Sequence, residues 1–255
     1  MQIIPMPAKV APDLDPSWQA QDALAGVVGA MGDPRFGTEA LAQLNRWMPL
    51  CWWSVYQLFS DQPPAMHLSG SHGVEDGTHA SWKAYRTSLY RRDATFAMAH
   101  EALRDCQPLL MHWHAHEFST AHREQIYTRH GLRERVSIVS SQGDSGALLA
   151  VNFYRHEAQP QFQDEELDAL GRSARLLLAC VRQHLGSHRR DVLNELTLRE
   201  REVCERMLKG WTHEGIAADL GVSASTVKTY RDRAFERLGV HHRNELFALV
   251  SGRLG

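Results

Sequence analysis

Hydrophobic residues between Leu196 and Val250 recur at helical spacing in four short runs that are separated by tight breaks. Apolar residues at i, i+3 and i+4 predict helices with one buried face and one exposed face. Thr197, with Glu200 three residues later, predicts a capping box at the start of the first run. Glycines follow the ends of the runs, as is common after helices. The pattern predicts an all-α domain of four helices over residues 196–255.

The third run has an apolar side and a polar side. Its apolar side predicts the face that packs on the domain core, and consists of Val227, Tyr230, Ala234 and Leu238. A short helix, a glycine-containing turn and a second helix with a polar, cationic outer face are typical of a helix-turn-helix, whose second helix enters the DNA major groove. We therefore expect the DNA contacts to come from Thr212, Ser225, Thr226, Lys228, Thr229, Arg231, Asp232, Arg233 and Arg243.

Upstream of this domain, helical and strand patterns alternate. Helical spacing predicts helices over residues 17–31, 38–48, 78–90, 94–103, 119–130 and 162–185, with Thr38 as the cap of the second. β-branched and aromatic residues predict strands over residues 51–59, 65–68, 135–140 and 147–154, the last two joined by a hairpin loop at 142–146. Residues 109–118 fit either pattern.

These elements predict two domains. Residues 17–185 predict an α+β sensor domain of PAS- or GAF-like α/β/α shape, in which helices flank a sheet. Residues 1–16 carry four prolines and predict an irregular arm. Residues 186–195 begin with a glycine and predict the linker to the all-α domain at 196–255.

The charge balance argues against a general polyanion-binding protein. The net charge of the chain is −2. Residues 191–255 carry two lysines and eight arginines against three aspartates and seven glutamates, so their net charge is zero. Because phosphate contacts supply most non-specific DNA affinity, we expect weak non-specific binding that depends on the cations gathered on the third helix.

The cysteines and the N-terminus indicate a reducing compartment. Cys51, Cys106, Cys180 and Cys204 lie far apart and match no metal or redox spacing, so we expect reduced thiols in the core. The first residues lack a basic region followed by an apolar run, and no stretch is long and apolar enough to span a membrane. We expect a cytoplasmic protein without membrane contact.

The C-terminal residues resemble the DNA-binding domain of LuxR-type transcription regulators. The matching positions are Leu196-Thr197, Arg199–Val203, Gly210, Ile216-Ala217, Leu220, Val222-Ser223, Thr226–Lys228, Leu238, Val240 and Arg243. Gly215 stands where the family usually has Glu, and Tyr230 where it usually has His. The resemblance implies a regulator that binds double-stranded DNA, as a homodimer on a two-fold symmetric operator.

The N-terminal half resembles the autoinducer-binding domain of the same family, on Trp82, Tyr85, Asp93–Thr95, Trp113, Gly131-Leu132 and the strand pair after them. In that family the aromatics line a pocket for an acyl-homoserine lactone, and the aspartate accepts the ligand amide N–H. The resemblance implies a ligand site of Tyr56, Trp82, Tyr85, Asp93, Thr95, Trp113 and Arg135. Arg135 falls near a position that is usually Gly, where a guanidinium would block an acyl chain or attract an anion.

Several of these residues have simpler interpretations. Asp93 could serve solely as the N-cap of the helix predicted to begin at Ala94. Of Trp52 and Trp53, adjacent on a strand, one should face inward and the other outward. His112, His114 and His116 would share one face of a strand and could bind zinc or copper. Without a carboxylate or Cys in a supporting spacing, however, the sequence predicts no metal site and no cofactor.

The sequence therefore predicts a ligand-responsive transcription regulator of LuxR type, either a quorum-sensing receptor or an orphan small-molecule receptor. The alternative is a regulator gated by protein contact, with no ligand. An enzyme would need a convergent acid-base set that the sequence does not show, so we expect no catalytic residues. We expect dimerisation through the sensor domain and helix 162–185, with a small contribution from Leu246, Phe247 and Val250 of the last helix.

Overall fold

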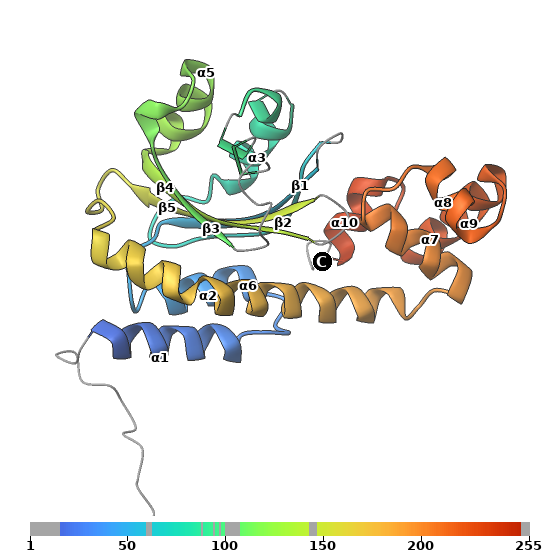
Figure 1. Ribbon diagram of the computed structural model, residues 1–255, viewed down its shortest axis with the longest axis horizontal. Helices are drawn as coiled ribbons and strands as arrows, with labels where there is room; N and C mark the ends of the chain where they lie inside the picture. Colours follow the sequence, from blue (N-terminus) through green and yellow to red (C-terminus); the bar gives the residue numbers. More distant parts are fainter. Residues whose placement is uncertain are drawn as a thin grey trace, which may run out of the picture.

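The computed structural model describes residues 16–59, 63–87, 89–93, 95–96, 98–99, 108–142 and 147–250. They form a three-layered α+β domain followed by an all-helical domain, which confirms the expected fold class (Figure 1). Most of the expected arm at 1–16 and of the hairpin loop at 142–146 lies outside the described residues, as does much of the helix expected at 94–103.

The described part of the first domain contains a five-stranded antiparallel sheet with the order β2-β1-β5-β4-β3. The strands are β1 (Trp52–Leu58), β2 (Ala65–Ser71), β3 (Leu109–His114), β4 (Leu132–Ser141) and β5 (Leu148–His156). The four expected strands are confirmed, and most are longer than expected. The ambiguous stretch 109–118 is the edge strand β3 followed by a 3-10 turn.

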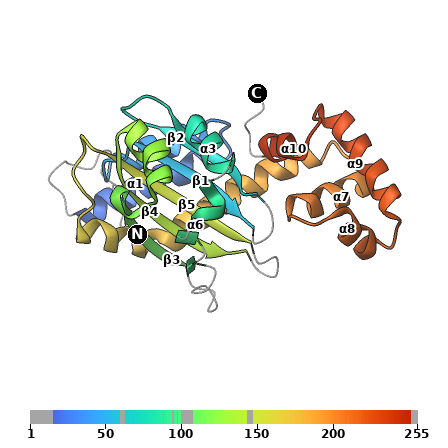
Figure 2. The same ribbon diagram turned by 90° about the horizontal axis from the view of Figure 1, so that it is seen from above.

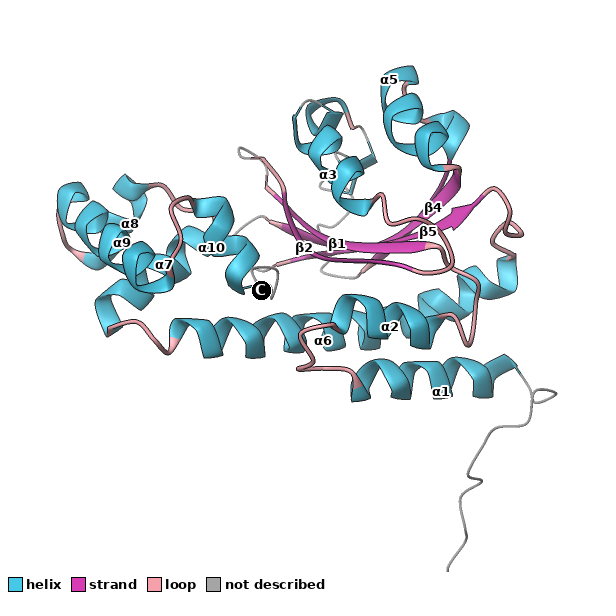
Figure 3. Ribbon diagram, turned by 180° about the vertical axis from the view of Figure 1, so that it is seen from behind, coloured by secondary structure: helices cyan, strands magenta, loops and turns pink. Residues whose placement is uncertain are grey.

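Helices cover both faces of the sheet (Figure 3). One face carries α1 (Pro16–Gly29), α2 (Phe36–Leu44) and α6 (Asp164–Leu193). The other carries α3 (Thr78–Thr87), the 3-10 turn Leu89–Arg92 and an irregular helical stretch from 115 to 130, which contains α5 (Thr120–His122). Trp52 and Trp53 are therefore both buried, on opposite faces, and the expectation that one of them faces outward is wrong.

The helix α2 begins and ends earlier than expected. Thr38 is not its cap, because the Asp33 side chain already accepts the Arg35 N–H at 2.7 Å and turns the chain into a helix that begins at Phe36. At its end, the Asn45 side chain donates to the Leu41 carbonyl at 3.0 Å and accepts the Leu50 N–H at 3.0 Å. These bonds draw the chain away from the helix axis after Leu44.

The helix expected at 119–130 is confirmed as helical but not as regular. After α5 the backbone forms a π turn over Arg123–Tyr127 and a 3-10 turn over Thr128–His130, and Gly131 then takes φ 61°. Only residues without a side-chain penalty adopt this left-handed conformation readily. The irregular turns place Tyr127 against the sheet, where it is 1% exposed.

The long helix α6 passes through the expected linker. It begins with Asp164, Glu165 and Glu166, which suit the positive end of the helix dipole. It was expected to end near residue 185, but it continues through Gly186 to Leu193, so the connection between the domains is mostly helical (Figure 1). Among the described residues no helix, α6 included, is both long enough and apolar enough to cross a membrane.

The second domain contains α7 (Leu198–Leu208), α8 (His213–Leu220), α9 (Ala224–Leu238) and α10 (Arg243–Val250), as expected. The Glu200 carboxylate accepts the Thr197 N–H at 3.0 Å, which confirms the capping box. Gly221 and Gly239 end α8 and α9 with φ near 65°. The apolar faces of the four helices meet in one core. This core also contains Phe235, which the sequence pattern did not single out.

The last helix packs on the first domain of the same chain. The Phe247 ring lies 6.0 Å from His67 on β2 and 6.4 Å from Phe59. Figure 2 shows α10 on the side of the helical domain that faces the sheet. Leu246, Phe247 and Val250 are each at most 7% exposed, which corrects the expectation that they supply a dimer contact in this conformation.

The described cysteines are buried thiols, as expected: Cys51, Cys180 and Cys204. Burial raises the pKa of the Cys51 thiol to about 12, which keeps the thiol protonated at neutral pH and therefore unreactive. Cys106 lies outside the described residues.

A glycine contact between α2 and β2 yields a stability prediction. A Cβ on Gly37 would lie 2.4 Å from the Ser69 carbonyl oxygen, a backbone atom that cannot move without disturbing the edge strand. Gly37→Ala should lower the free energy of unfolding by about 1–3 kcal/mol, as overpacking does. Urea unfolding measures this change.

Gly29→Ala is the matched control, because a Cβ at Gly29 meets no atom within 4 Å. It should leave stability unchanged or raise it slightly, since Ala favours helix. Equal effects of the two substitutions would contradict the close contact.

Candidate DNA-binding helix and candidate sensor pocket

The outward face of α9 is built by its cap and its turn. The Ser223 hydroxyl accepts the Thr226 N–H at 3.1 Å, so Ser223 is the N-cap. Val227 and Ala234 are fully buried on the inner side. The predicted contact residues that this leaves exposed are Ser225, Lys228, Thr229, Asp232 and Arg233.

The remaining residues that were predicted to contact DNA already interact with groups of the helical domain itself. Thr212 caps α8 by accepting the Gly215 N–H at 3.1 Å. Arg231 donates to Asp232 at 2.6 Å, so its charge is partly balanced. Arg243 donates to the Met207 carbonyl at the end of α7 and lies 5.9 Å from the Phe247 ring centre. Thr226, half-buried, helps to fix the first turn of α9.

Four of these residues line one open hollow of about 460 Å³ in the helical domain: Thr212, Arg231, Asp232 and Arg243. Trp211 and His213 complete part of its wall. Burial, and then the cations Arg231, Lys228 and Arg243, lower the pKa of His213, so this imidazole is neutral at pH 7. Lys228 and Arg233 are exposed on the neighbouring face of α9, and neither forms a salt bridge within the described residues.

The sensor pocket lies on the other domain, between the sheet and α3, and Arg135 points into it. The Arg135 side chain is 2% exposed. One amino group donates to the Thr95 hydroxyl at 2.8 Å, and the other lies 4.0 Å from an Asp93 carboxylate oxygen. The guanidinium sits 5.0 Å from each of the ring centres of Phe96 and Phe118. It is therefore held by one carboxylate and two aromatic faces.

Asp93 both caps a turn and anchors the pocket. One carboxylate oxygen accepts the Thr95 N–H at 3.0 Å and the Thr95 hydroxyl at 2.5 Å. The other accepts the Tyr85 hydroxyl at 3.1 Å and faces Arg135. The carboxylate is thus occupied by internal partners, which supports the capping interpretation and adds a counterion role.

The pocket wall contains several residues that the sequence pattern did not identify. The structure adds Trp52, Ser54, Thr78, Ser81, His122, Ile126, Tyr127 and Tyr154 to the expected Tyr56, Tyr85 and Arg135. Tyr127 and His122 lie on the irregular turns, where no simple spacing marks them. Trp82 and Trp113 stand further out, Trp82 against the Tyr56 ring at 4.9 Å and Trp113 against Phe118 at 6.0 Å.

Burial makes the wall rich in hydrogen-bond donors. It raises the pKa of Tyr56, Tyr85 and Tyr127 well above the ordinary value, so their hydroxyls stay protonated. The Tyr127 hydroxyl and Arg135 Nε find no hydrogen-bond partner within the described residues. The open space at the centre is about 20 Å³, room for about one water molecule.

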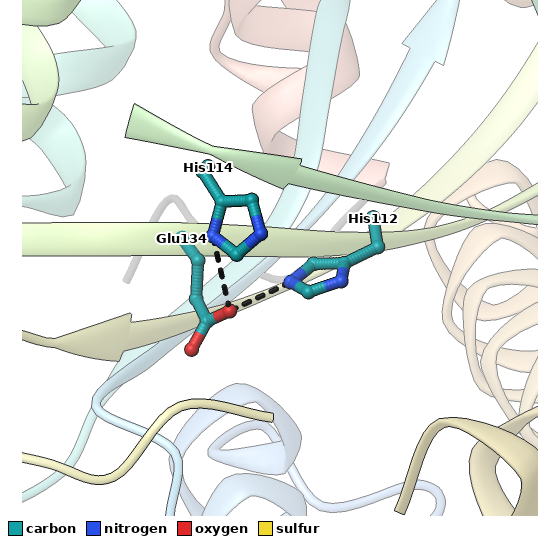
Figure 4. Close-up of side chains that lie close together, drawn as sticks. All are labelled: His112, His114 and Glu134. Carbon is teal, nitrogen blue, oxygen red and sulfur yellow. Dashed lines mark hydrogen bonds and ion pairs between the residues drawn. The ribbon is translucent and has the colours of Figure 1, made fainter. Parts of the chain in front are cut away.

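The three alternating histidines do not gather as considered from the sequence. His116 lies in the 3-10 turn after β3 and is exposed. His112 and His114 instead face Glu134, a buried carboxylate on β4 (Figure 4). The carboxylate that the sequence spacing lacked therefore comes from the neighbouring strand.

The helical domain matches the family model described as "Bacterial regulatory proteins, luxR family" over residues 194–250. A protein described as "Probable transcriptional regulatory protein SgaR" from Hyphomicrobium methylovorum is 34% identical over 123 residues, 46% of this chain and 57% of that protein. The transcriptional regulatory protein UhpA of Escherichia coli K12 is 44% identical over 62 residues, 24% of this chain and 30% of that protein. The chain spans little more than half of SgaR and less than a third of UhpA.

Solved structures show a more distant likeness over a longer part of the chain. Escherichia coli SdiA aligns with 94% of this chain and 98% of its own, at 17% identity and a TM-score of 0.41. CepR2 of Burkholderia cenocepacia aligns with 65% of this chain and 92% of its own, at 11% identity and a TM-score of 0.46.

The buried His122 predicts a pH dependence of stability. Burial lowers its pKa to about 4, although Asp93 opposes the shift. The unfolded chain binds a proton near pH 6.5 and the folded chain only near pH 4, so stability falls as the pH drops through this window. Between pH 7 and pH 4.5, the free energy of unfolding should fall by on the order of 2–3 kcal/mol more in the natural chain than in His122→Gln.

Urea unfolding at pH 7 and at pH 4.5 measures this difference. His79→Gln, a change at an exposed position on α3, is the matched control. It should lose as much stability between the two pH values as the natural chain does. The same pH dependence in all three chains would show that His122 does not carry it.

Proposed function

Because residues 194–250 form a LuxR-family helix-turn-helix domain, we propose that this chain is a DNA-binding transcription regulator. One observation carries the proposal: α9 follows the Gly221 turn and exposes Ser225, Lys228, Thr229 and Arg233 along one face. A helix of this kind fits the major groove, with its N-terminal residues at the base edges. A regulator of this bacterial family acts where the chromosome lies, in the cytoplasm.

We propose that the regulator binds a two-fold symmetric operator as a homodimer. A single helix-turn-helix contacts too few base pairs to select one genomic site, so two copies on two half-sites are needed. Because the apolar face of α10 is covered within the chain, we place the dimer surface on the sensor domain. Leu176, 45% exposed on α6, supports a contact along that helix.

We propose that the pocket around Arg135 makes the regulator responsive to a small molecule with an anionic or acceptor-rich head. A buried guanidinium requires compensation, and Arg135 has Asp93 only at 4.0 Å and an unpartnered Nε. The Tyr127 hydroxyl is a second unpartnered donor in the same wall. Because the pocket offers donors, it favours a carboxylate or carbonyl group over an amide N–H.

The small size of the cavity favours a second candidate function. About 20 Å³ leaves no room for an acyl chain without movement of the wall. A regulator whose first domain binds a protein partner would need no larger cavity. In such a regulator the Arg135 side chain would only stabilise the fold. The two candidates differ in whether any small probe binds.

The DNA-binding proposal predicts a change in salt dependence. Lys228→Ala with Arg231→Ala should weaken binding to duplex DNA, and the slope of log affinity against log salt should fall by about 0.9 for each lost phosphate contact. Mobility shifts of the full chain at several salt concentrations measure the slope. An unchanged slope would mean that α9 does not lie in the groove.

Lys83→Ala with Arg86→Ala supplies the matched control for this experiment. This pair removes the same two positive charges from exposed side chains of α3, in the other domain. Its slope of log affinity against log salt should equal that of the natural chain. An equal fall of the slope in the control would mean that the effect comes from the net charge of the protein and not from α9.

The ligand proposal predicts a preference set by Arg135. N-Octanoyl-homoserine lactone should bind weakly, because the guanidinium fills space and keeps its charge. The ring-opened carboxylate of the same molecule should bind more tightly, and Arg135→Gly should reverse this order. Calorimetry on the natural chain and on the variant measures both affinities.

Tight lactone binding by the natural chain would contradict the role of Arg135. Failure of both probes to bind either protein would favour gating by a protein partner. Thermal melting without ligand checks that Arg135→Gly is folded, and Arg135→Met is the variant that keeps the side-chain volume if it is not.

A further inference from the structure

The face of the sheet that lies under α6 carries a second group of polar side chains, away from the pocket. His112 and His114 occupy alternate positions of the edge strand β3, so their side chains share that face with Leu110. Glu134 lies directly opposite His114 on β4. Figure 4 shows the two imidazoles and the carboxylate pointing toward one another.

The three groups converge on one point. Glu134 Oε2 lies 2.6 Å from His112 Nε2 and 3.7 Å from His114 Nδ1. One ligand atom of each residue lies within 4.8 Å of the other two. Around a tetrahedral zinc ion, ligand atoms at about 2.1 Å from the metal lie roughly 3.4 Å apart. Small side-chain rotations would therefore open the cluster to the spacing that a metal ion needs.

We propose that His112, His114 and Glu134 form a binding site for a divalent first-row transition-metal ion. Two imidazoles and one carboxylate suit Zn²⁺, Ni²⁺ or Cu²⁺, whereas Mg²⁺ and Ca²⁺ require oxygen ligands. Three protein ligands leave at least one position for water or a further group. His116 stacks on His114 with ring centres 5.5 Å apart and stands outside the cluster.

The surroundings support a site more than an isolated ion pair. The Glu134 side chain is fully buried, and its second oxygen accepts the Phe162 N–H at 2.9 Å, a bond that orients a ligating carboxylate. The histidine side chains are 24% and 37% exposed, which leaves an ion a path from solvent. A buried carboxylate that faces two accessible imidazoles is therefore both oriented and reachable.

The position of the site gives its occupancy a structural consequence. His112 and His114 lie on an edge strand, and the Phe162 N–H bond ties Glu134 to the segment that enters α6. A bound ion would join β3, β4 and the start of α6 at one point. Metal binding should therefore stabilise the sensor domain against heat.

Zn²⁺ titration of the untagged full chain tests the proposal. Calorimetry should show one tight site per chain, and Co²⁺ should give the intense visible absorption of a tetrahedral site. His112→Ala and His114→Ala should each weaken binding at least about tenfold and abolish the Co²⁺ bands. Mg²⁺ should neither compete nor raise the melting temperature.

His79→Ala and His116→Ala are the matched controls, because both remove exposed histidines that lie outside the cluster. They should retain the site. Melting without metal checks that the His114→Ala variant, at the more exposed position, is folded. Unchanged Zn²⁺ affinity in the His112→Ala, His114→Ala double variant, or an equal loss in the controls, would overturn the proposal.

Discussion

Burial of both faces of the sheet is the constraint on which the rest of the structure depends. Antiparallel sheets often leave one face in water, but here every residue of β1 is buried. Successive side chains along a strand therefore enter two different buried layers, one on each face of the sheet. Arg135 enters the pocket under α3, while Glu134 enters the layer under α6. Each buried charge must then find partners on its own side, which is why two separate polar clusters exist on one sheet.

Local patterns predicted the parts of the structure that local interactions determine. The capping box at Thr197, the glycines that follow the helices and the apolar faces of α7 to α9 are short-range features, and the structure has them in place. The sequence pattern left the direction of the Arg135 side chain open, and the structure turns it into the pocket. Partners distant in sequence could not be predicted: Tyr127 reaches the pocket from irregular turns, and Glu134 meets His112 only through strand pairing.

The continuous helix α6 and the docked helix α10 connect the two domains. A sequence break at Gly186 predicted a linker between the domains. One glycine, however, destabilises a helix by only about 1 kcal/mol, and α6 runs on to Leu193. The Phe247 contact with His67 adds a second connection, at the edge strand β2. A change in the pocket or under α6 therefore has two physical routes to the position of α9. Both routes lie in packed elements rather than in a loose linker.

We propose that α9 of this chain lies in the DNA major groove when the protein binds DNA. Amide hydrogen exchange of the full chain, with and without duplex DNA at low salt, tests it most directly. If α9 lies in the groove, exchange should slow over residues 212–233, which cover α8 and the first turns of α9, and the sheet should be unchanged. Slower exchange confined to α7, α10 or the sensor domain, with α9 unaffected, would contradict it.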